Sequence, residues 1–125
     1  MAHKKNPRRV DENSAIARLS KLKSSPRKLN LVAQMIRNKN VFDAISALKF
    51  CEKRIAQDVR KLLDSAIANA ENNHGLDIDN LIVSEATVGR EMIMKRIDIK
   101  GRSRRGIIKK PFSNMRIVVS QVGAN

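Results

Sequence analysis

The stretch KRIDIKGRSRRGIIKK, residues 95–110, limits the folds open to this chain more than any other feature of the sequence. It holds eight basic residues and one acid, and so carries +7 of the chain's formal net charge of +14. A segment with this charge cannot enter an apolar core, because buried charges without partners are too costly to desolvate. It must lie on the surface, where its charge favours a polyanionic partner such as nucleic acid.

Length and composition predict one domain with an aliphatic core. The chain has 125 residues, 42% of them hydrophobic, with no Trp, no Tyr and three Phe. This is enough for one modest core of Leu, Ile, Val, Ala and Met. Residues 43–91 hold more acids than bases, so the positive charge lies toward the two ends. We expect a basic tail over residues 1–13, which either contacts RNA or is frayed, and a single domain over 14–125.

The sequence gives no sign of an oxidising compartment or a membrane. Cys51 is the only cysteine, so no disulfide can form within the chain. The opening MAHKKNPRRV is charged where a signal peptide needs an apolar run, and no later run approaches the roughly 18 apolar residues of a membrane span. We therefore expect a cytoplasmic protein without a membrane partner.

Apolar residues at helical spacing predict three helices in the middle of the chain. The first starts after Ser25, whose hydroxyl can cap it, with Pro26 in the first turn, and it ends near residues 38–40. The second spans residues 41–50, and the third ends before Gly75, a typical C-cap. The expected inward faces are Leu29, Val32, Ala33 and Ile36; Val41, Ala44, Ile45 and Leu48; and Ile55, Val59, Leu62, Leu63, Ala66, Ile67 and Ala70.

Three β-branched stretches predict a sheet under these helices. They are residues 16–23, 81–88 and 114–122. The first fits helical spacing as well as an irregular strand, and we interpret it as a strand. Because helices and strands do not alternate as βαβ units, we expect an α+β fold in which three helices pack on a three-stranded antiparallel sheet.

Residues 89–113 separate the last two strands by 25 residues, far more than the usual hairpin loop. Apolar residues recur on both sides of the GRS turn at 101–103, so we expect the strands to continue and pair as a long protruding basic β-hairpin. Each arm would reach roughly 40 Å at about 3.3 Å per residue. Gly101 and Gly106 are expected to let the backbone turn or approach a phosphate. The alternative is a solvated disordered loop.

The few aromatic residues indicate how a nucleic acid would be recognised. Phe42 and Phe50 lie on or beside a core helix, and Phe112 lies at the base of the hairpin. Readers of single strands stack bases on aromatic side chains, and no such platform is predicted here. Recognition should rest on phosphates, 2′-hydroxyls and folded shape.

The residues do not predict an enzyme, a metal site or a cofactor. His3 lies in the tail and His74 at a helix end, where a histidine is typically a surface or capping residue. Cys51 has no histidine near it in sequence and is interpreted as a buried, inert thiol. GRSRRG is followed by Ile107 instead of Lys and Ser or Thr, so it is no phosphate loop. We expect no small-molecule substrate.

The main alternative is a DNA-bending architectural protein with a basic β-ribbon arm. Such arms insert an apolar wedge or a proline between base pairs. The one proline of this segment, Pro111, is predicted at the base of the hairpin instead of its tip, which disfavours this alternative.

Four stretches of the chain together resemble large-subunit ribosomal protein twenty-two of bacteria. They are SPRKLNLVAQMIRNK (25–39), DSAIANAENN (64–73), MKR (94–96) and GRSRRG with the following KKPFS (101–113). The likeness runs from about residue 14 to residue 120, in the right order and at the right spacing.

This resemblance implies the fold expected above and a role as a structural constituent of the large ribosomal subunit. In that family the globular part lies near the exit of the peptide tunnel, and the hairpin runs through ribosomal RNA to line the tunnel wall. The implied partners are large-subunit ribosomal RNA, neighbouring large-subunit proteins and the nascent polypeptide, and the implied location is the cytoplasmic ribosome.

The resemblance also implies roles for individual residues. Positions that match rRNA-binding residues are Arg27, Lys28, Lys95, Arg96, Lys100, Arg102, Arg104, Arg105, Lys109 and Lys110. Positions that match the tunnel-lining part of the hairpin are Met94, Lys95, Arg96, Lys100, Gly101 and Arg102. Many relatives have Pro-Arg-Ala before the tip where this chain has Ile99, Lys100 and Gly101, so the charge of the tip is predicted but its backbone path is not.

Overall fold

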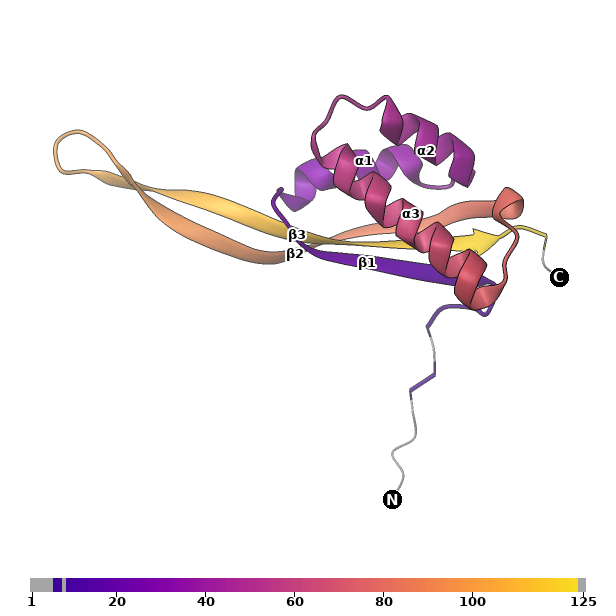
Figure 1. Ribbon diagram of the computed structural model, residues 1–125. Coiled ribbons are helices and arrows are strands. Elements are labelled where there is room, and N and C mark those ends of the chain that lie inside the picture. Colours follow the sequence, from indigo (N-terminus) through magenta and orange to yellow (C-terminus); the bar gives the residue numbers. More distant parts are fainter. Residues whose placement is uncertain (1–5, 8, 124–125) are drawn as a thin grey trace, which may run out of the picture.

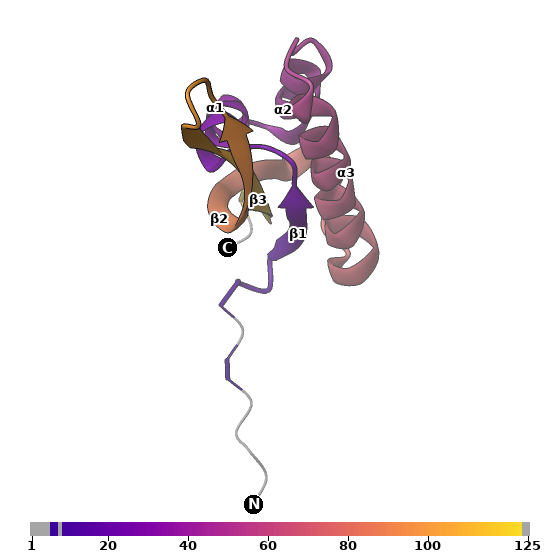
Figure 2. The same cartoon turned by 90° about the vertical axis from the view of Figure 1, so that its left-hand side faces the viewer.

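The computed structural model describes residues 6–7 and 9–123. Its elements in chain order are β1 (Ser14–Leu22), α1 (Pro26–Ile36), α2 (Val41–Lys49), α3 (Ile55–His74), the short 3-10 helix η1 (Ile78–Asn80), β2 (Leu81–Ile99) and β3 (Arg105–Gln121). The strands form one antiparallel sheet in the order β1-β3-β2. The helices lie on one side of this sheet, and the far ends of β2 and β3 extend well beyond them (Figures 1 and 2). The α+β prediction of three helices on a three-stranded antiparallel sheet is confirmed.

The core lies between the helices and the covered face of the sheet. The apolar stripe expected for α1 is fully buried, and on the other two helices the expected stripes are buried except for the half-buried Ile45 and Ile67. The strands contribute alternate residues, since successive side chains of a strand point to opposite faces. The buried positions of β3 that alternate in this way are Ser113, Met115, Ile117 and Val119. Each such aliphatic side chain contributes about 1.5–3 kcal/mol by leaving water.

The helix ends follow the capping chemistry expected from the sequence. The Ser25 hydroxyl accepts a hydrogen bond from the Lys28 backbone N–H at 3.3 Å, which caps α1. Gly75 follows α3 with φ at +61°, a left-handed conformation that glycine adopts without steric cost. These local signals therefore set where the helices begin and end.

Strand β1 is irregular, which explains its ambiguous sequence pattern. Ala15 and Ala17 are buried on the core side, as a strand requires. Lys21 then adopts φ +58°, and the register with β3 shifts between Leu19 and Leu22. Leu22 turns inward out of the alternating order, so Leu19 and Leu22 acquire the spacing of a helix. The interpretation as a strand is confirmed.

Strands β2 and β3 pair continuously from Leu81↔Gln121 to Ile99↔Arg105. The two strands predicted at 81–88 and 114–122 are thus the covered ends of much longer strands. Strand β3 starts at Arg105, and its pairing with β1 begins only at Ser113, so about 26 Å of the ladder projects beyond the three-stranded sheet. The 40 Å expected for each arm also counted turn residues 102–104 and the base residue Ser113, which pairs with β1.

The tip is built differently from the sequence prediction. Gly101 and Gly106 are expected to let the backbone turn or approach a phosphate, but the left-handed φ values of the turn fall on Arg102 (+59°) and Ser103 (+58°). The Lys100 N–H donates to the Arg104 carbonyl at 2.9 Å, and the Arg104 N–H donates to the Gly101 carbonyl at 3.3 Å. The strand register therefore places two non-glycine residues at the centre of the turn, a conformation that costs more for them than for glycine.

The predicted N-terminal tail is only partly covered by the structure. Residues 1–5 and 8, including His3, lie outside the described residues, as do residues 124 and 125.

Candidate nucleic-acid interface

The projecting part of β2 and β3, here called the hairpin (residues 92–112), carries its basic residues on both faces. Opposite residues of an antiparallel ladder share a face. One face carries the pairs Ile93↔Pro111, Lys95↔Lys109, Ile97↔Ile107 and Ile99↔Arg105, and the other carries Met94↔Lys110, Arg96↔Ile108 and Asp98↔Gly106. Lys95 directly opposes Lys109, a like-charge arrangement that destabilises a ladder. The charges of the hairpin thus oppose its own folding.

The hairpin also lacks a core of its own. Ile97, Ile99 and Ile107 are 65%, 86% and 67% exposed, although the same residue type is fully buried where helices cover the strands. Asp98 is the one acid of the hairpin, and its carboxylate pairs with Lys100 Nζ at 2.7 Å. An exposed ion pair of this kind adds little stability. The hairpin therefore presents its cations to solvent, where a polyanion can reach them.

Two hydrogen bonds hold the base of the hairpin to the end of β1 and to the segment that follows it. The buried Ser113 hydroxyl donates to the Ser24 carbonyl. Glu91 is the extra residue where the β2 register shifts, and its carboxylate accepts from the Lys21 backbone N–H. The bulge at Glu91 and the left-handed residue Lys21 therefore meet at one point, and the direction of the hairpin is set there.

Beside this anchor lies a strongly basic hollow, here called the basal groove. Its lining residues are Lys23, Ser24, Ser25, Lys28, Arg54, Lys109, Lys110 and Pro111. These described residues include five bases and no acid. The first turn of α1 also contributes the positive end of its helix dipole. The groove has the charge and the N–H donors that bind a phosphate.

The structure brings some predicted site residues together and separates others. Lys28 from α1 meets Lys109 and Lys110 from β3 in the basal groove. Arg27 is exposed in the same helical turn but does not line the groove. The tip residues Lys100, Arg102, Arg104 and Arg105 lie at the other end of the hairpin.

The interface includes residues that the sequence reasoning did not select. Lys23 and Arg54 line the basal groove, and Arg54 Nη2 donates to the Lys23 carbonyl at 3.3 Å. Lys23 immediately precedes the serine pair that starts α1, and this position next to a helix start could have identified it from the sequence as an interface residue. Arg54 precedes α3 and reaches the groove only through tertiary packing, so no local pattern could identify it.

The aromatic residues lie at the predicted places, and two of them are largely exposed. Phe42 and Phe50 belong to α2 and its C-terminal end, as expected, but their side chains are 51% and 81% exposed. Both lie with α2 in the globular part, away from the tip (Figure 1). Phe112 is half-buried opposite Met92 at the hairpin base. The hairpin itself carries no aromatic ring beyond Phe112, so base stacking along it is not favoured.

Of the residues considered for catalysis, Cys51 and His74 lie at opposite ends of α3. Cys51 is half-buried, with its Sγ 4.0 Å from Met35 Sδ, and His74 ends α3. Over residues 6–7 and 9–123, no group of three or more His, Cys, Asp and Glu side chains is placed to hold a metal ion. In the same residues, none of the helices is both long and apolar enough to span a membrane.

Comparison with known proteins agrees with this architecture. Residues 17–120 match the family described as ribosomal protein L22p/L17e. The chain is 58% identical to the large ribosomal subunit protein uL22 of Cereibacter sphaeroides, over 98% of both chains. It is 58% identical to uL22 of Jannaschia sp. and 55% identical to uL22 of Maricaulis maris, in each case over 98% of this chain and 97% of the relative. The chain belongs to the ribosomal protein L22p/L17e family.

Proposed function

We propose that this chain is a structural constituent of the large ribosomal subunit, where it binds large-subunit ribosomal RNA and supports its assembly. The observation that carries the proposal is the hairpin, an exposed two-stranded ladder with opposed cations and no core of its own. Such a ribbon is marginal in water, and neutralisation by phosphates would remove its main source of instability. The family and its relatives are ribosomal, and the role is structural rather than enzymatic.

In this proposal the basal groove and the hairpin have different tasks. Arg27, Lys28, Lys109 and Lys110 hold the RNA backbone at the fixed base. The remaining rRNA-binding residues lie along the projecting ribbon and its tip, and they are Lys95, Arg96, Lys100, Arg102, Arg104 and Arg105. Because the base is anchored by Ser113 and Glu91, binding there orients the hairpin as it enters the RNA.

The proposal extends to the nascent-peptide exit tunnel and to the surroundings of the chain. Met94, Lys95, Arg96, Lys100, Gly101 and Arg102 would line the tunnel wall and face the nascent polypeptide. Neighbouring large-subunit proteins would contact the globular part, residues 14–125 would act as one domain, and the basic tail at 1–13 would contact RNA. The protein would be bound to the ribosome in the cytoplasm.

Cosedimentation tests this function against the DNA-bending alternative. The turn at Gly101, Arg102 and Ser103 offers no apolar wedge, and Pro111 pairs with Ile93 at the hairpin base. We expect the purified chain to sediment with large ribosomal subunits that lack this protein, and to bind duplex DNA much more weakly at the same salt concentration. Equal binding to both, or a bend introduced into the DNA, would favour the alternative.

A further inference from the structure

We infer that the open face of the sheet, opposite the helices, carries a second site for an RNA phosphate, centred on Arg18 and Arg116. The inference rests on the proposed function, because that function supplies the RNA. It adds a contact at residues that belong to neither the hairpin nor the basal groove, on the three-stranded part of the sheet, and it places RNA on both sides of the sheet.

The strand register puts the two arginines side by side on this face. Met115 and Ile117 of β3 are buried toward the helices, so the alternate residue Arg116 faces the other way. Arg116 pairs with Arg18 of β1 on one side and with Thr87 of β2 on the other. One row of neighbouring residues across the three strands therefore consists of Arg18 on β1, Arg116 on β3 and Thr87 on β2.

This row holds more positive charge than the protein neutralises. Opposed like charges in neighbouring strands destabilise a sheet. Glu85 pairs with Arg116 Nη2 at 2.6 Å, but the buried Arg116 Nε has no hydrogen-bond partner among residues 6–7 and 9–123. The Arg18 side chain makes no hydrogen bond or ion pair with any residue that the structure describes. One carboxylate thus lies beside two guanidinium groups and pairs with only one of them, so the charge of Arg18 is left for an anion to neutralise.

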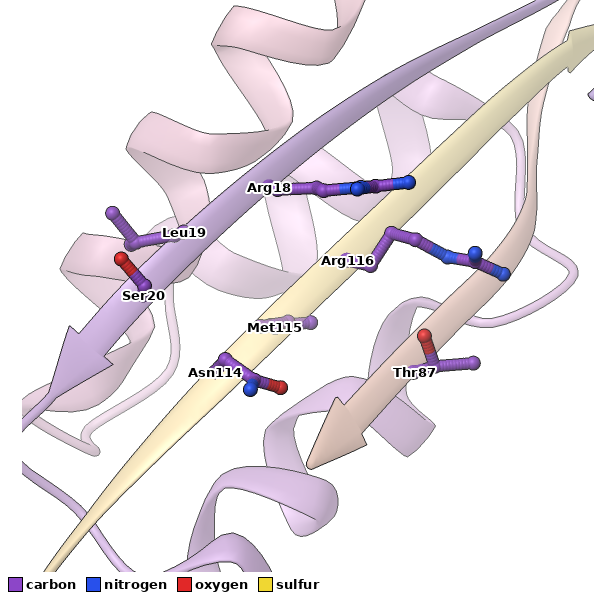
Figure 3. Close-up of a pocket in the computed structure, with 7 residues that line it drawn as sticks. All are labelled: Arg18, Leu19, Ser20, Thr87, Asn114, Met115 and Arg116. Carbon is purple, nitrogen blue, oxygen red and sulfur yellow. The ribbon is translucent and has the colours of Figure 1, made fainter. Parts of the chain in front are cut away.

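The arginines border a hollow whose other polar groups are also hydrogen-bond donors. It is lined by Arg18, Leu19, Ser20, Thr87, Asn114, Met115 and Arg116. Figure 3 shows both arginine side chains extending across the sheet toward β2, where Thr87 lies. Gly89 leaves room for the Asn114 amide, since a Cβ at this position would come within 2.7 Å of Asn114 Oδ1. The hollow thus offers two guanidinium groups, an amide and two hydroxyls.

This donor set fits a phosphodiester better than a base or a lipid. Guanidinium groups bind phosphate oxygens through two parallel hydrogen bonds, and hydroxyl and amide side chains are common partners of the RNA backbone. None of the 7 lining residues is aromatic, so stacked bases have no platform. The site would therefore hold the backbone of an RNA strand without reading its sequence.

Binding to a large-subunit rRNA transcript over a range of salt concentrations tests the inference. The test variant combines Arg18→Gln, which removes an unneutralised charge, with Arg116→Lys, which keeps the charge beside Glu85 but loses the planar fork. The matched control is Arg60→Gln on the exposed surface of α3, and it removes the same charge. We expect the test variant to bind about tenfold or more weakly, with a salt slope lower by about one, while the control stays near wild type.

Tethered cleavage locates the contact from the positions that are cut, and it leaves both arginines in place. An iron chelate is attached at Ser20→Cys in a Cys51→Ser chain, and a second tether at Ser103→Cys marks the hairpin. We expect the first tether to cut an rRNA segment different from the one cut by the second. Circular dichroism and thermal melting of all variants check that the fold is kept.

The outcomes separate this inference from the proposed function. If wild type shows no salt-dependent binding to rRNA, both are overturned. If Lys109→Gln with Lys110→Gln weakens binding but the Arg18 and Arg116 variant matches the Arg60→Gln control, the open-face site is overturned and the proposed function stands. The open-face site is also overturned if the Ser103 tether cuts rRNA and the Ser20 tether does not. It is overturned as well if a polyglutamate peptide binds at Arg18 more tightly than RNA does.

Discussion

Strands β2 and β3 run through two regions of the molecule in which the same residue types have opposite environments. Ile117 of β3 is fully buried under the helices, whereas Ile107 of the same strand is 67% exposed in the hairpin. Both lie in the same ladder and have the same β-propensity. Burial is therefore set by what covers the strand, and only one end of the ladder is covered by helices and by β1. We therefore expect the covered half to hold its own fold and the bare half to depend on a partner.

The largest expected difference concerns RNA affinity. Two double variants remove equal charge. Arg104→Gln with Arg105→Gln removes it from the bare half, and Arg60→Gln with Lys61→Gln removes it from α3 in the covered half. If six or more phosphates are contacted, wild-type affinity for rRNA should fall by about 10³–10⁵ between about 50 and 200 mM salt. The hairpin variant should lower that salt dependence, and the α3 variant should leave it unchanged. Filter binding measures the affinity of both variants. An equal dependence of affinity on salt for the two variants would contradict the expected difference between the halves.

Truncating Ile117 and Ile107 to alanine compares the contribution of each half to the free energy of unfolding. Ile117→Ala should destabilise the fold by about 2–5 kcal/mol, because it leaves a cavity in a packed core. Ile107→Ala should change the free energy of unfolding by less than about 0.5 kcal/mol, since its side chain is already largely in water. Urea unfolding of the free protein measures both. A loss of stability on Ile107→Ala as large as that on Ile117→Ala would mean that the hairpin has a core of its own.

A substitution at the junction between the halves should have an intermediate effect on the free energy of unfolding. Ser113→Ala removes the buried hydroxyl that donates to the Ser24 carbonyl, which should cost about 1–2 kcal/mol. Ser65→Ala, at an exposed position of α3, is the control and should be nearly neutral. Thermal melting gives the stability, and hydrogen exchange should show faster opening at the hairpin base. If both variants melt alike, the hairpin is not anchored there.

Local chemistry made the covered half predictable, and long-range pairing made the bare half less so. The α1 stripe from Leu29 to Ile36 and the caps at Ser25 and Gly75 depend on neighbours in sequence, so their pattern was sufficient. The hairpin was predicted from its length and its recurring apolar residues. Its projecting length depends on where β1 ends, and that end is set by the conformation of Lys21. Arg54 joins the basal groove through packing, which no local pattern records.

Substitutions in the turn at the tip should have the smallest effect on stability, and they test the bare half most specifically. Register, not composition, gives Ser103 its φ of +58°, and a serine there is strained relative to glycine. Ser103→Gly should therefore stabilise the hairpin by about 0.5–1 kcal/mol without changing its charge. Gly101 has no positive φ, and a Cβ added there would meet no other atom within 4 Å. Gly101→Ala should therefore shift stability by only about a few tenths of a kcal/mol.

Hydrogen exchange of the free protein measures this effect, because the amides of residues 94–110 should be weakly protected until RNA binds. Ser103→Gly should slow their exchange by about twofold to fivefold, following the same free-energy change, and leave the amides of α3 unaffected. Strong protection of the whole hairpin in the unmodified free protein would show that it folds without a partner. A loss of stability on Gly101→Ala, together with no gain on Ser103→Gly, would mean that the turn depends on the glycine at 101 instead of on residues 102 and 103.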